Sequence, residues 1–281
     1  MANRGLLAVL PALALLGVGL SARAAEGQRV DLVSHTALRV CADPSNMPFS
    51  NDKGEGFENK IAAIVAADLK LPVEYTWFPQ VTGFIRNTLF AKRCDVVMGY
   101  AQGDDLVLNT NPYYRSTYAL VYRKGAGLDG VDHLADARLG DKRIGIVAAT
   151  PPSDIMLRLG LMQRAKPYPL MVDRRYEAPA ERMIGDIRSG DIDAGVLWGP
   201  IAGYYAARDG EPLTLVPLVR EASEARLAYR ITFGVRNLED DWKHQLNGII
   251  ARRQGEIDAI LLAYGVPLLD EQSHLITAPR R

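Results

Sequence analysis

The strongest constraint on the fold is an alternation of short apolar strands with amphipathic helices that runs through the chain twice. The first round begins with a predicted strand at Leu38–Cys41 and a helix from Phe57 to Leu69, whose apolar side chains recur at helical spacing. The second begins with a strand at 143–147 and a helix that opens at Pro151. Strands and helices in this order favour parallel pairing with right-handed crossovers. The pattern therefore predicts two α/β lobes built on parallel sheet.

The remaining elements follow from the same alternation and from the turn formers between them. Strands are expected at 73–78, 95–99, 117–123, 168–172, 194–198, 213–219 and 229–235, and helices at 84–89, 178–187, 201–207 and 242–261. If the last helix packs on the first lobe, the chain crosses between the lobes twice, near 119–125 and 228–236. Two lobes joined by two crossover strands make a hinged clamshell. We expect residues 25–120 with 235–281 to form lobe 1 and 121–234 to form lobe 2.

The first 24 residues predict a cleavable signal peptide. Arg4 is followed by an uncharged apolar run from Gly5 to Leu20 and then by the small-residue sequence Ala22-Arg23-Ala24. The run is shorter than the roughly 18 residues expected of a membrane-spanning helix. No cysteine follows it closely, so a lipid anchor is not expected either. Residues 1–24 are therefore expected to direct the mature chain to the periplasm.

Charge balance excludes one large class of function. The chain carries 33 Lys and Arg residues against 33 Asp and Glu residues, so no basic excess is available to neutralise phosphates. Nucleic-acid binding therefore loses its main source of affinity. The hydrophobic fraction of 48% and the charged fraction of 23% are typical of a folded globular protein.

Cys41 and Cys94 are the only two cysteines. In an oxidising compartment an even pair favours a disulfide, and both positions fall in or beside strands that are expected to be neighbours. The alternative is two buried free thiols. A metal site is not expected, since two isolated cysteines and four scattered histidines show no ligand spacing.

Enzyme motifs are absent or incomplete. The segment from Gly125 to Gly130 has the spacing G-x-G-x-x-G, but no long helix follows it, and apolar strand stands where a dinucleotide site needs an acid. The sequence contains no G-x-S-x-G, P-loop or H-E-x-x-H motif. Asp104 and Asp105 are adjacent, whereas a sugar hydrolase needs two carboxyl groups set apart across a cleft. We therefore expect no catalytic residue and no cofactor.

Segments along nearly the whole mature chain resemble the family 3 extracellular solute-binding proteins, the type II periplasmic clamshells of ABC importers. They are Leu38-Arg39-Val40, Pro48-Phe49-Ser50, Gly56-Phe57-Glu58, Cys94 to Gly99, Asn111-Pro112-Tyr113-Tyr114, Ala178-Pro179-Ala180-Glu181 and Ser189 to Ala194. The resemblance implies the type II fold.

The chain departs from this family where amino-acid binders hold their ligand. Those proteins carry an arginine in the loop after the third strand, whose fork binds the ligand carboxylate. Here that loop runs from Tyr100 to Asp105 and contains acids and no arginine. Asn59-Lys60 also replaces the family's usual apolar-acidic pair. An amino-acid ligand is therefore not expected.

Three stretches look more specifically like the quinoprotein-dehydrogenase-associated binding proteins, the MoxJ and XoxJ proteins of methanol oxidation. They are Cys41 to Lys60, Tyr75 to Gln80 and Leu197 to Tyr205. The resemblance implies a periplasmic accessory of a PQQ-dependent methanol or alcohol dehydrogenase, with a binding-protein fold reused for partner binding or activation. Two alternatives stay open: an importer receptor for a small non-amino-acid ligand, and a cleft enzyme.

The candidate binding site is the cleft between the lobes, at the loops that follow the carboxyl ends of the strands. The residues expected to line it are Asp43, Asn46, Phe49, Trp77, Phe78, Tyr100, Gln102 and Asp104 from lobe 1, and Thr150, Ser153, Tyr176, Trp198 and Tyr204 from lobe 2. Aromatic rings predominate and bring a large contact area at a small entropy cost. The cleft should therefore suit an apolar ligand or an inserted protein segment better than a zwitterion.

Several of these residues have a purely structural alternative. Phe78 and Tyr204 can be core residues. Thr150 and Ser153 can cap the helix that starts there. Asp43 and Asn46 can stabilise the turn that contains them.

Overall fold

A computed structural model describes residues 32–208, 210–211, 213–221 and 225–280. The signal peptide expected at 1–24 lies outside the described residues. Within them, no helix combines the length and the apolar character needed to cross a membrane.

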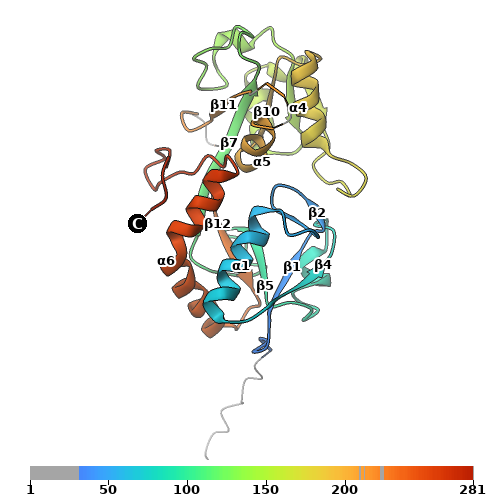
Figure 1. Cartoon of the computed structure of the whole chain (residues 1–281). Helices are drawn as coiled ribbons and strands as arrows, with labels where there is room; N and C mark the ends of the chain where they lie inside the picture. Colours follow the sequence, from blue (N-terminus) through green and yellow to red (C-terminus); the bar gives the residue numbers. More distant parts are fainter. Residues whose placement is uncertain (1–31, 209, 212, 222–224, 281) are drawn as a thin grey trace, which may run out of the picture. The chain divides into compact units, whose positions relative to one another are not determined.

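The alternation of strands and helices is confirmed, with shifts at the ends of several elements (Figure 1). The strands are β1 (Leu38–Ala42), β2 (Ser45–Asn46), β3 (Ser50–Asn51), β4 (Val73–Trp77), β5 (Val96–Ala101), β6 (Leu108–Asn109), β7 (Tyr114–Tyr122), β8 (Ile144–Val147), β9 (Lys166–Tyr168), β10 (Ala194–Trp198), β11 (Thr214–Pro217) and β12 (Ala228–Val235). The helices are α1 (Phe57–Leu69), α2 (Phe84–Asn87), α3 (Pro151–Arg158), α4 (Pro179–Ser189), α5 (Gly199–Ala206) and α6 (Asp240–Ala263), with 3₁₀ turns η1 (Ala137–Leu139) and η2 (Leu161–Gln163).

The main sheet is mixed, which corrects the expectation of purely parallel pairing. Among the described residues its strand order is β4-β1-β5-β12-β7-β10-β8-β9, with β6 beside β12 and β11 beside β7. β1 pairs in parallel with β4 and β5, and β8 in parallel with β9 and β10. Between these two parallel groups, β12 and β7 run antiparallel to their neighbours. They are the two strands that join the lobes; the exact lobe boundaries stay a prediction.

Several expected elements are shorter in the structure, and two of them differ most. The strand expected at 168–172 ends at Tyr168, and residues 169–178 form a loop. A proline cannot donate to a strand ladder, and Pro169 stands where the strand was expected to continue. The helix expected at 84–89 keeps only the four residues of α2.

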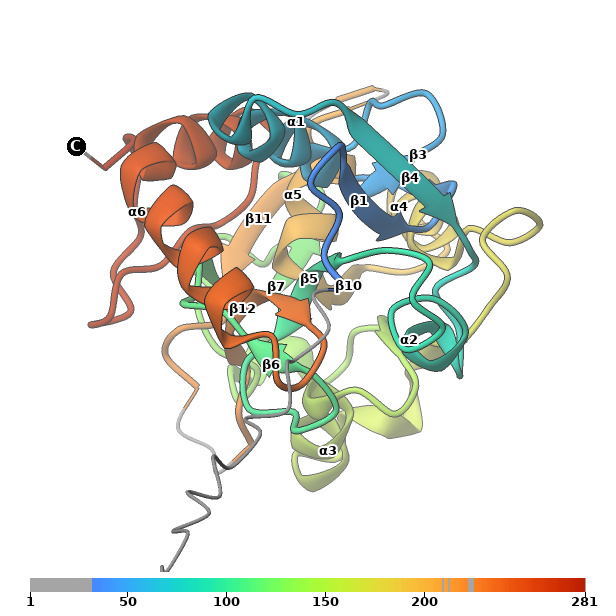
Figure 2. The same cartoon turned by 90° about the horizontal axis from the view of Figure 1, so that it is seen from below.

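The last helix, α6, packs on the first lobe. This is the arrangement expected if the chain crosses between the lobes twice. Leu246 and Ile249 of α6 share one apolar cluster with Phe57 and Ile61 of α1, and Figure 2 shows these two helices side by side. The second lobe has its own apolar clusters, one on each face of its strands. Each lobe therefore has a separate core.

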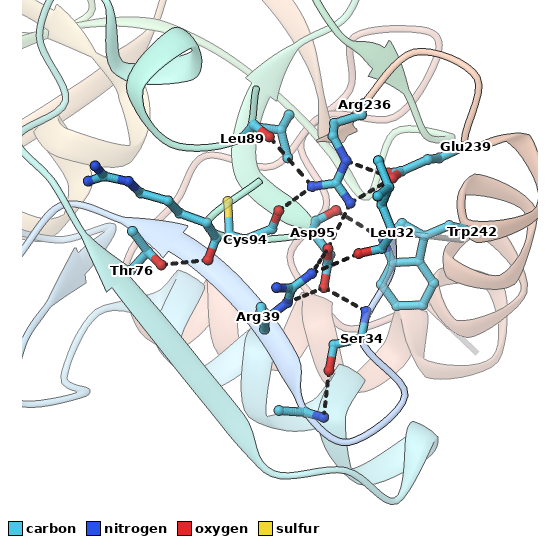
Figure 3. Close-up of polar contacts among 12 residues, drawn as sticks. Leu32, Ser34, Arg39, Thr76, Leu89, Cys94, Asp95, Arg236, Glu239 and Trp242 are labelled. Atoms are coloured by element: carbon cyan, nitrogen blue, oxygen red, sulfur yellow. Dashed lines mark hydrogen bonds and ion pairs between the residues drawn. The ribbon is translucent and has the colours of Figure 1, made fainter. Parts of the chain in front are cut away.

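A buried carboxylate, Asp95, joins distant segments of the first lobe (Figure 3). It is 1% exposed and accepts hydrogen bonds from Arg39 Nε at 2.7 Å and from Arg236 Nη2 at 2.7 Å. The main-chain N–H of Ser34 donates to it at 3.0 Å. Its carbonyl accepts a hydrogen bond from the Trp242 indole at 3.0 Å. One residue therefore connects β1, β5, the end of β12 and the start of α6.

Arg236 is the second buried member of this cluster, at 6% exposed. Beyond Asp95, it donates to the carbonyl of Cys94 and to Glu239 Oε1, the latter at 2.6 Å. Cys94 itself forms the expected disulfide with Cys41, with Cα atoms 5.5 Å apart. The disulfide links β1 to the residue that precedes Asp95, so covalent and ionic links meet at one place.

Glu58 is a buried carboxyl group of a different kind, because it makes no hydrogen bond through its side chain within the described residues. It is 8% exposed and lies against Gly99, where an added Cβ would be 2.2 Å from Oε1. Burial raises the pKa of Glu58 from 4.5 to about 8. The folded protein therefore keeps this group protonated at neutral pH.

We expect Asp95→Asn to lower the free energy of unfolding by on the order of 3 to 5 kcal/mol, because it removes the buried carboxylate that Arg39 and Arg236 share and leaves Arg236 with Glu239 alone. Urea unfolding at pH 7 measures this. Asp141→Asn is the control, since Asp141 is 74% exposed and lies 3.6 Å from Lys142; it should change stability by less than about 0.5 kcal/mol. Equal effects of the two variants would contradict a central role for Asp95.

We expect Glu58→Gln to stabilise the protein at pH 8 and to flatten its pH dependence. Between 4.5 and about 8 the unfolded chain loses the proton of Glu58 and the folded protein keeps it. The wild-type free energy of unfolding should therefore fall by roughly 4 kcal/mol as the pH rises from 5 to 8. Urea unfolding across this pH range measures the effect, with Glu211→Gln at an exposed position as the control. If the free energy of unfolding of Glu58→Gln depends on pH as steeply as that of the wild type and the control, Glu58 does not carry the pH dependence.

Candidate functional site

The loop that follows β1 forms one wall of the cleft, and Asp43 holds its shape. Asp43 is 3% exposed; its Oδ1 accepts from the Ser45 N–H at 2.8 Å and its Oδ2 from the Gln80 N–H at 2.7 Å. Asn46 adds a second link, donating from Nδ2 to Gln80 Oε1 at 2.7 Å. These bonds tie the loop after β1 to the loop after β4, so both polar side chains are used in building the wall.

A cavity of about 240 Å³ lies between this loop and the second lobe. It is lined by Pro44, Ser45, Met47, Asn51, Asp52 and Lys53 on one side and by Arg174, Glu177, Ala178, Ala180, Glu181 and Tyr205 on the other. The Tyr205 hydroxyl donates to Glu181 Oε1 at 2.9 Å and lies 3.3 Å from the Met47 carbonyl. The two lobes therefore approach each other at this hydroxyl, beside charges of both signs.

A smaller cavity of about 70 Å³ lies deeper in the second lobe, and Arg174 lines both cavities. Its walls are Tyr118, Val147, Thr150, Pro169, Leu170, Arg174, Pro179, Ala180, Leu197, Trp198 and Ile201. Arg174 is the one charged residue among these. Trp198 packs edge to face on Tyr118, with ring centroids 5.3 Å apart. This cavity is therefore apolar and aromatic around a single cation.

Arg174 is the unusual side chain of the site. Within the described residues it makes no hydrogen bond and no ion pair. Its partial burial lowers the pKa of the guanidinium, while the charge of Asp43 acts in the opposite direction. A cation in such a place is available to an incoming acceptor.

Of the residues expected in the second lobe, Thr150, Trp198 and Tyr204 line these cavities or a neighbouring one, and Ser153 and Tyr176 do not. Thr150 and Trp198 line the smaller cavity, and Ser153 donates to the Thr150 carbonyl at 2.6 Å. Tyr204 is 8% exposed, stacks on Tyr264 at 5.8 Å and lines a neighbouring cavity. Tyr176 is 81% exposed on the loop 169–178.

The aromatic residues expected from the first lobe lie elsewhere than the two cavities that meet at Arg174. Phe49 packs edge to face on Phe57 at 5.2 Å, Trp77 stacks on Tyr75 at 4.5 Å, and Phe78 lies 6.4 Å from Phe84. These rings pack mainly against their own lobe. Their part in binding stays a prediction.

The acidic loop after β5 is occupied by its own contacts. Tyr100 donates to Asp104 Oδ2 at 3.0 Å, and burial together with this carboxylate raises the pKa of Tyr100. Asp104 Oδ1 accepts from the Leu106 N–H at 2.9 Å, and the Gln102 N–H donates to the Arg230 carbonyl at 2.9 Å. Among the described residues no group of three or more His, Cys, Asp or Glu side chains could hold a metal ion.

Sequence reasoning placed Tyr176 of the loop 169–178 in the cleft but did not single out Arg174. The available signal was a pair of arginines, Arg174-Arg175, two positions before that residue. Arg175 is paired with Asp173 at 2.6 Å, and its neighbour is not. Only the structure distinguishes the two.

Behind the cleft, α5 and the turn after α6 are in main-chain contact. An added Cβ on Gly203 would lie 1.8 Å from the Gly265 carbonyl oxygen, and Gly265 has φ of +72°. Both positions therefore require glycine, one for space and one for its backbone conformation. This contact fixes α5, and with it Tyr204 and Tyr205.

Comparison with known proteins supports the type II fold. No family model matches the chain. It is 30% identical over 264 residues to the protein MoxJ of Methylorubrum extorquens, covering 89% of this chain and 86% of MoxJ. It is 45% identical to the crystal structure of the periplasmic binding protein XoxJ from Methylobacterium extorquens AM1, with a TM-score of 0.72 over 83% of this chain and 100% of XoxJ. An ancestral cationic amino acid solute binding protein shares the fold at 22% identity and a TM-score of 0.66, over 82% and 95% of the two chains.

We expect Gly203→Ala to lower the free energy of unfolding by about 3 kcal/mol, because its methyl group meets main chain and not a side chain that can move. Gly185→Ala in α4 is the matched control, since nothing lies within 4 Å of the added atom; it should raise stability by up to about 1 kcal/mol. Thermal unfolding of both variants measures the difference. A neutral Gly203→Ala would mean that α5 can move away from α6.

Proposed function

Because the chain belongs to the family of the MoxJ and XoxJ periplasmic binding proteins, we propose that it is a periplasmic accessory of a PQQ-dependent methanol or alcohol dehydrogenase. In this role it binds the dehydrogenase and supports or activates it. The chain contributes binding surfaces and no catalytic step of its own. Its export to the periplasm through the predicted signal peptide is part of the same proposal.

The observation that carries the proposal is the 45% identity to XoxJ over the whole of that protein. It extends well beyond the fold, since the amino acid solute binding protein shares the fold at 22% identity. The stretch from Cys41 to Lys60, which carries the sequence resemblance to the dehydrogenase-associated proteins, also contributes the lobe-1 wall of the larger cavity. That the partner is a PQQ-dependent dehydrogenase is inferred from this sequence resemblance.

A surface suited to a protein partner lies on the loop 169–178, at the rim of the cleft. Leu170, Met171 and Tyr176 are 44%, 56% and 81% exposed. Single exposed apolar residues are ordinary, but three on one short loop form an apolar edge of the kind found at protein interfaces. We therefore place the docking surface on this loop.

Two of the solved structures that the chain resembles are binding proteins by name, which supports a role without catalysis. The importer receptor for a small non-amino-acid ligand is the second candidate. One observation favours it, namely the unpaired Arg174 at the junction of two cavities. The two candidates differ in their partner, a large enzyme or a small molecule.

The first test is size-exclusion chromatography of residues 25–281 with a purified PQQ-dependent methanol dehydrogenase, followed by dye-linked activity with and without the chain. We expect co-elution or a changed rate. If the chain neither co-elutes with the dehydrogenase nor changes its rate, the accessory role is contradicted. The importer receptor is then the better candidate.

We expect Tyr176→Ala to weaken binding to the dehydrogenase by about tenfold, since an exposed aromatic anchor contributes more than about 1 kcal/mol at an interface. Leu238→Ala is the control, because Leu238 is 73% exposed and lies between β12 and α6. Surface-immobilised dehydrogenase and a concentration series of each variant measure the affinities. If Tyr176→Ala binds the dehydrogenase as tightly as the wild type does, the loop is not part of the interface. The partnership itself is tested separately by co-elution.

A further inference from the structure

The smaller cavity gathers hydrogen-bond donors that have no acceptor within the described residues. The Arg174 guanidinium offers five N–H groups and uses none. The Tyr118 hydroxyl and the Trp198 indole N–H also make no hydrogen bond, although both residues line the cavity. The Thr150 hydroxyl already donates to the Val147 carbonyl at 2.6 Å. None of these unused donor atoms is fully enclosed, so each can meet an acceptor that enters the cavity.

Among the described residues no carboxylate forms an ion pair with Arg174, although Glu177 and Glu181 line the larger cavity beside it. Asp43 is the carboxylate whose charge reaches it, but both Asp43 oxygens already accept main-chain N–H groups at 2.8 and 2.7 Å. The adjacent Arg175 shows the usual arrangement, because its guanidinium is held by Asp173 at 2.6 Å. The difference between these two neighbours marks Arg174 as a cation kept for a ligand.

The walls determine what kind of acceptor fits. No acidic side chain lines the smaller cavity, so the ammonium group of a zwitterion would find no partner there. Its volume of about 70 Å³ is well below the ~150 Å³ that holds a benzene molecule. Leu197, Ile201 and Val147 offer apolar surface for a short hydrocarbon chain.

We propose that this cavity binds a short-chain monocarboxylate of about two to four carbons, with the carboxylate on Arg174 and the hydrocarbon part against Trp198 and Ile201. An arginine fork and a carboxylate form paired, charge-assisted hydrogen bonds. The Tyr118 hydroxyl and the Trp198 indole N–H are further donors on residues that line the cavity. The carboxylate is thus bound from the second lobe, whereas the amino-acid binders of this superfamily bind it from the first.

The proposal does not rest on the dehydrogenase partnership, since every residue that it uses belongs to this chain. Its test is made on residues 25–281 alone, so failure here leaves the accessory role untouched, and failure of the co-elution test leaves this cavity untouched.

Isothermal titration calorimetry with sodium acetate, propionate and butyrate tests the proposal, with butyramide and butylammonium chloride at matched ionic strength as controls. We expect saturable binding of at least one carboxylate with a Kd below about 1 mM, and no binding of the amide or the amine. No saturable carboxylate binding up to 10 mM, or equal binding of butyramide, would overturn the proposal.

Arg174→Gln should weaken carboxylate binding at least about tenfold, because the paired charge-assisted hydrogen bonds are lost. Arg175→Gln is the matched control and should bind as the wild type does. Arg174→Lys keeps the charge without the fork and should fall between them, which keeps the test usable if Arg174→Gln folds poorly; circular dichroism checks the fold of each. Carboxylate affinity equal to wild type in both Arg174 variants would place the ligand elsewhere.

Discussion

The buried pairing of Asp95 with Arg39 and Arg236 is the interaction on which the first lobe depends. A carboxylate that is 1% exposed would be strongly unfavourable without compensating charges, so its two arginines and the Ser34 N–H must all be in place together. Arg236 follows β12, the strand by which the chain returns from the second lobe. Its docking on Asp95 fixes the end of that strand beside β5. The register of the crossing, and hence the position of the second lobe, starts from this cluster.

Local patterns were sufficient for elements whose apolar side chains repeat regularly. The strand expected at 194–198 is β10 with the same bounds, and the long helix expected at 242–261 is α6 extended by two residues at each end. The prolines around Tyr168 interrupted a strand that apolar content alone had continued. The antiparallel strands β7 and β12 were recognised as strands and as crossings, but pairing direction depends on which strands become neighbours, and a sequence pattern does not contain that.

The cleft was harder to derive than the fold for the same reason. Trp198 and Thr150 could be placed beside a cavity from their position at a strand end and a helix start. Whether a charged side chain has a partner depends on residues far away in the chain, as Arg174 and Arg175 show. Glu58 is a similar case, since the motif Gly56-Phe57-Glu58 marks the start of a helix but does not reveal that the carboxyl group is enclosed against Gly99. Asp104, in the loop after β5, accepts hydrogen bonds from Tyr100 and Leu106 nearby. The cation of the cleft, Arg174, comes from the opposite lobe.

The touching main chains of Gly203 and Gly265 have a mechanical consequence. A contact made of backbone has no rotamers to rearrange, so α5 cannot shift against the turn after α6 without losing it. Ile201, which the proposed carboxylate ligand would contact, also lies on α5, so the same contact holds one wall of that cavity.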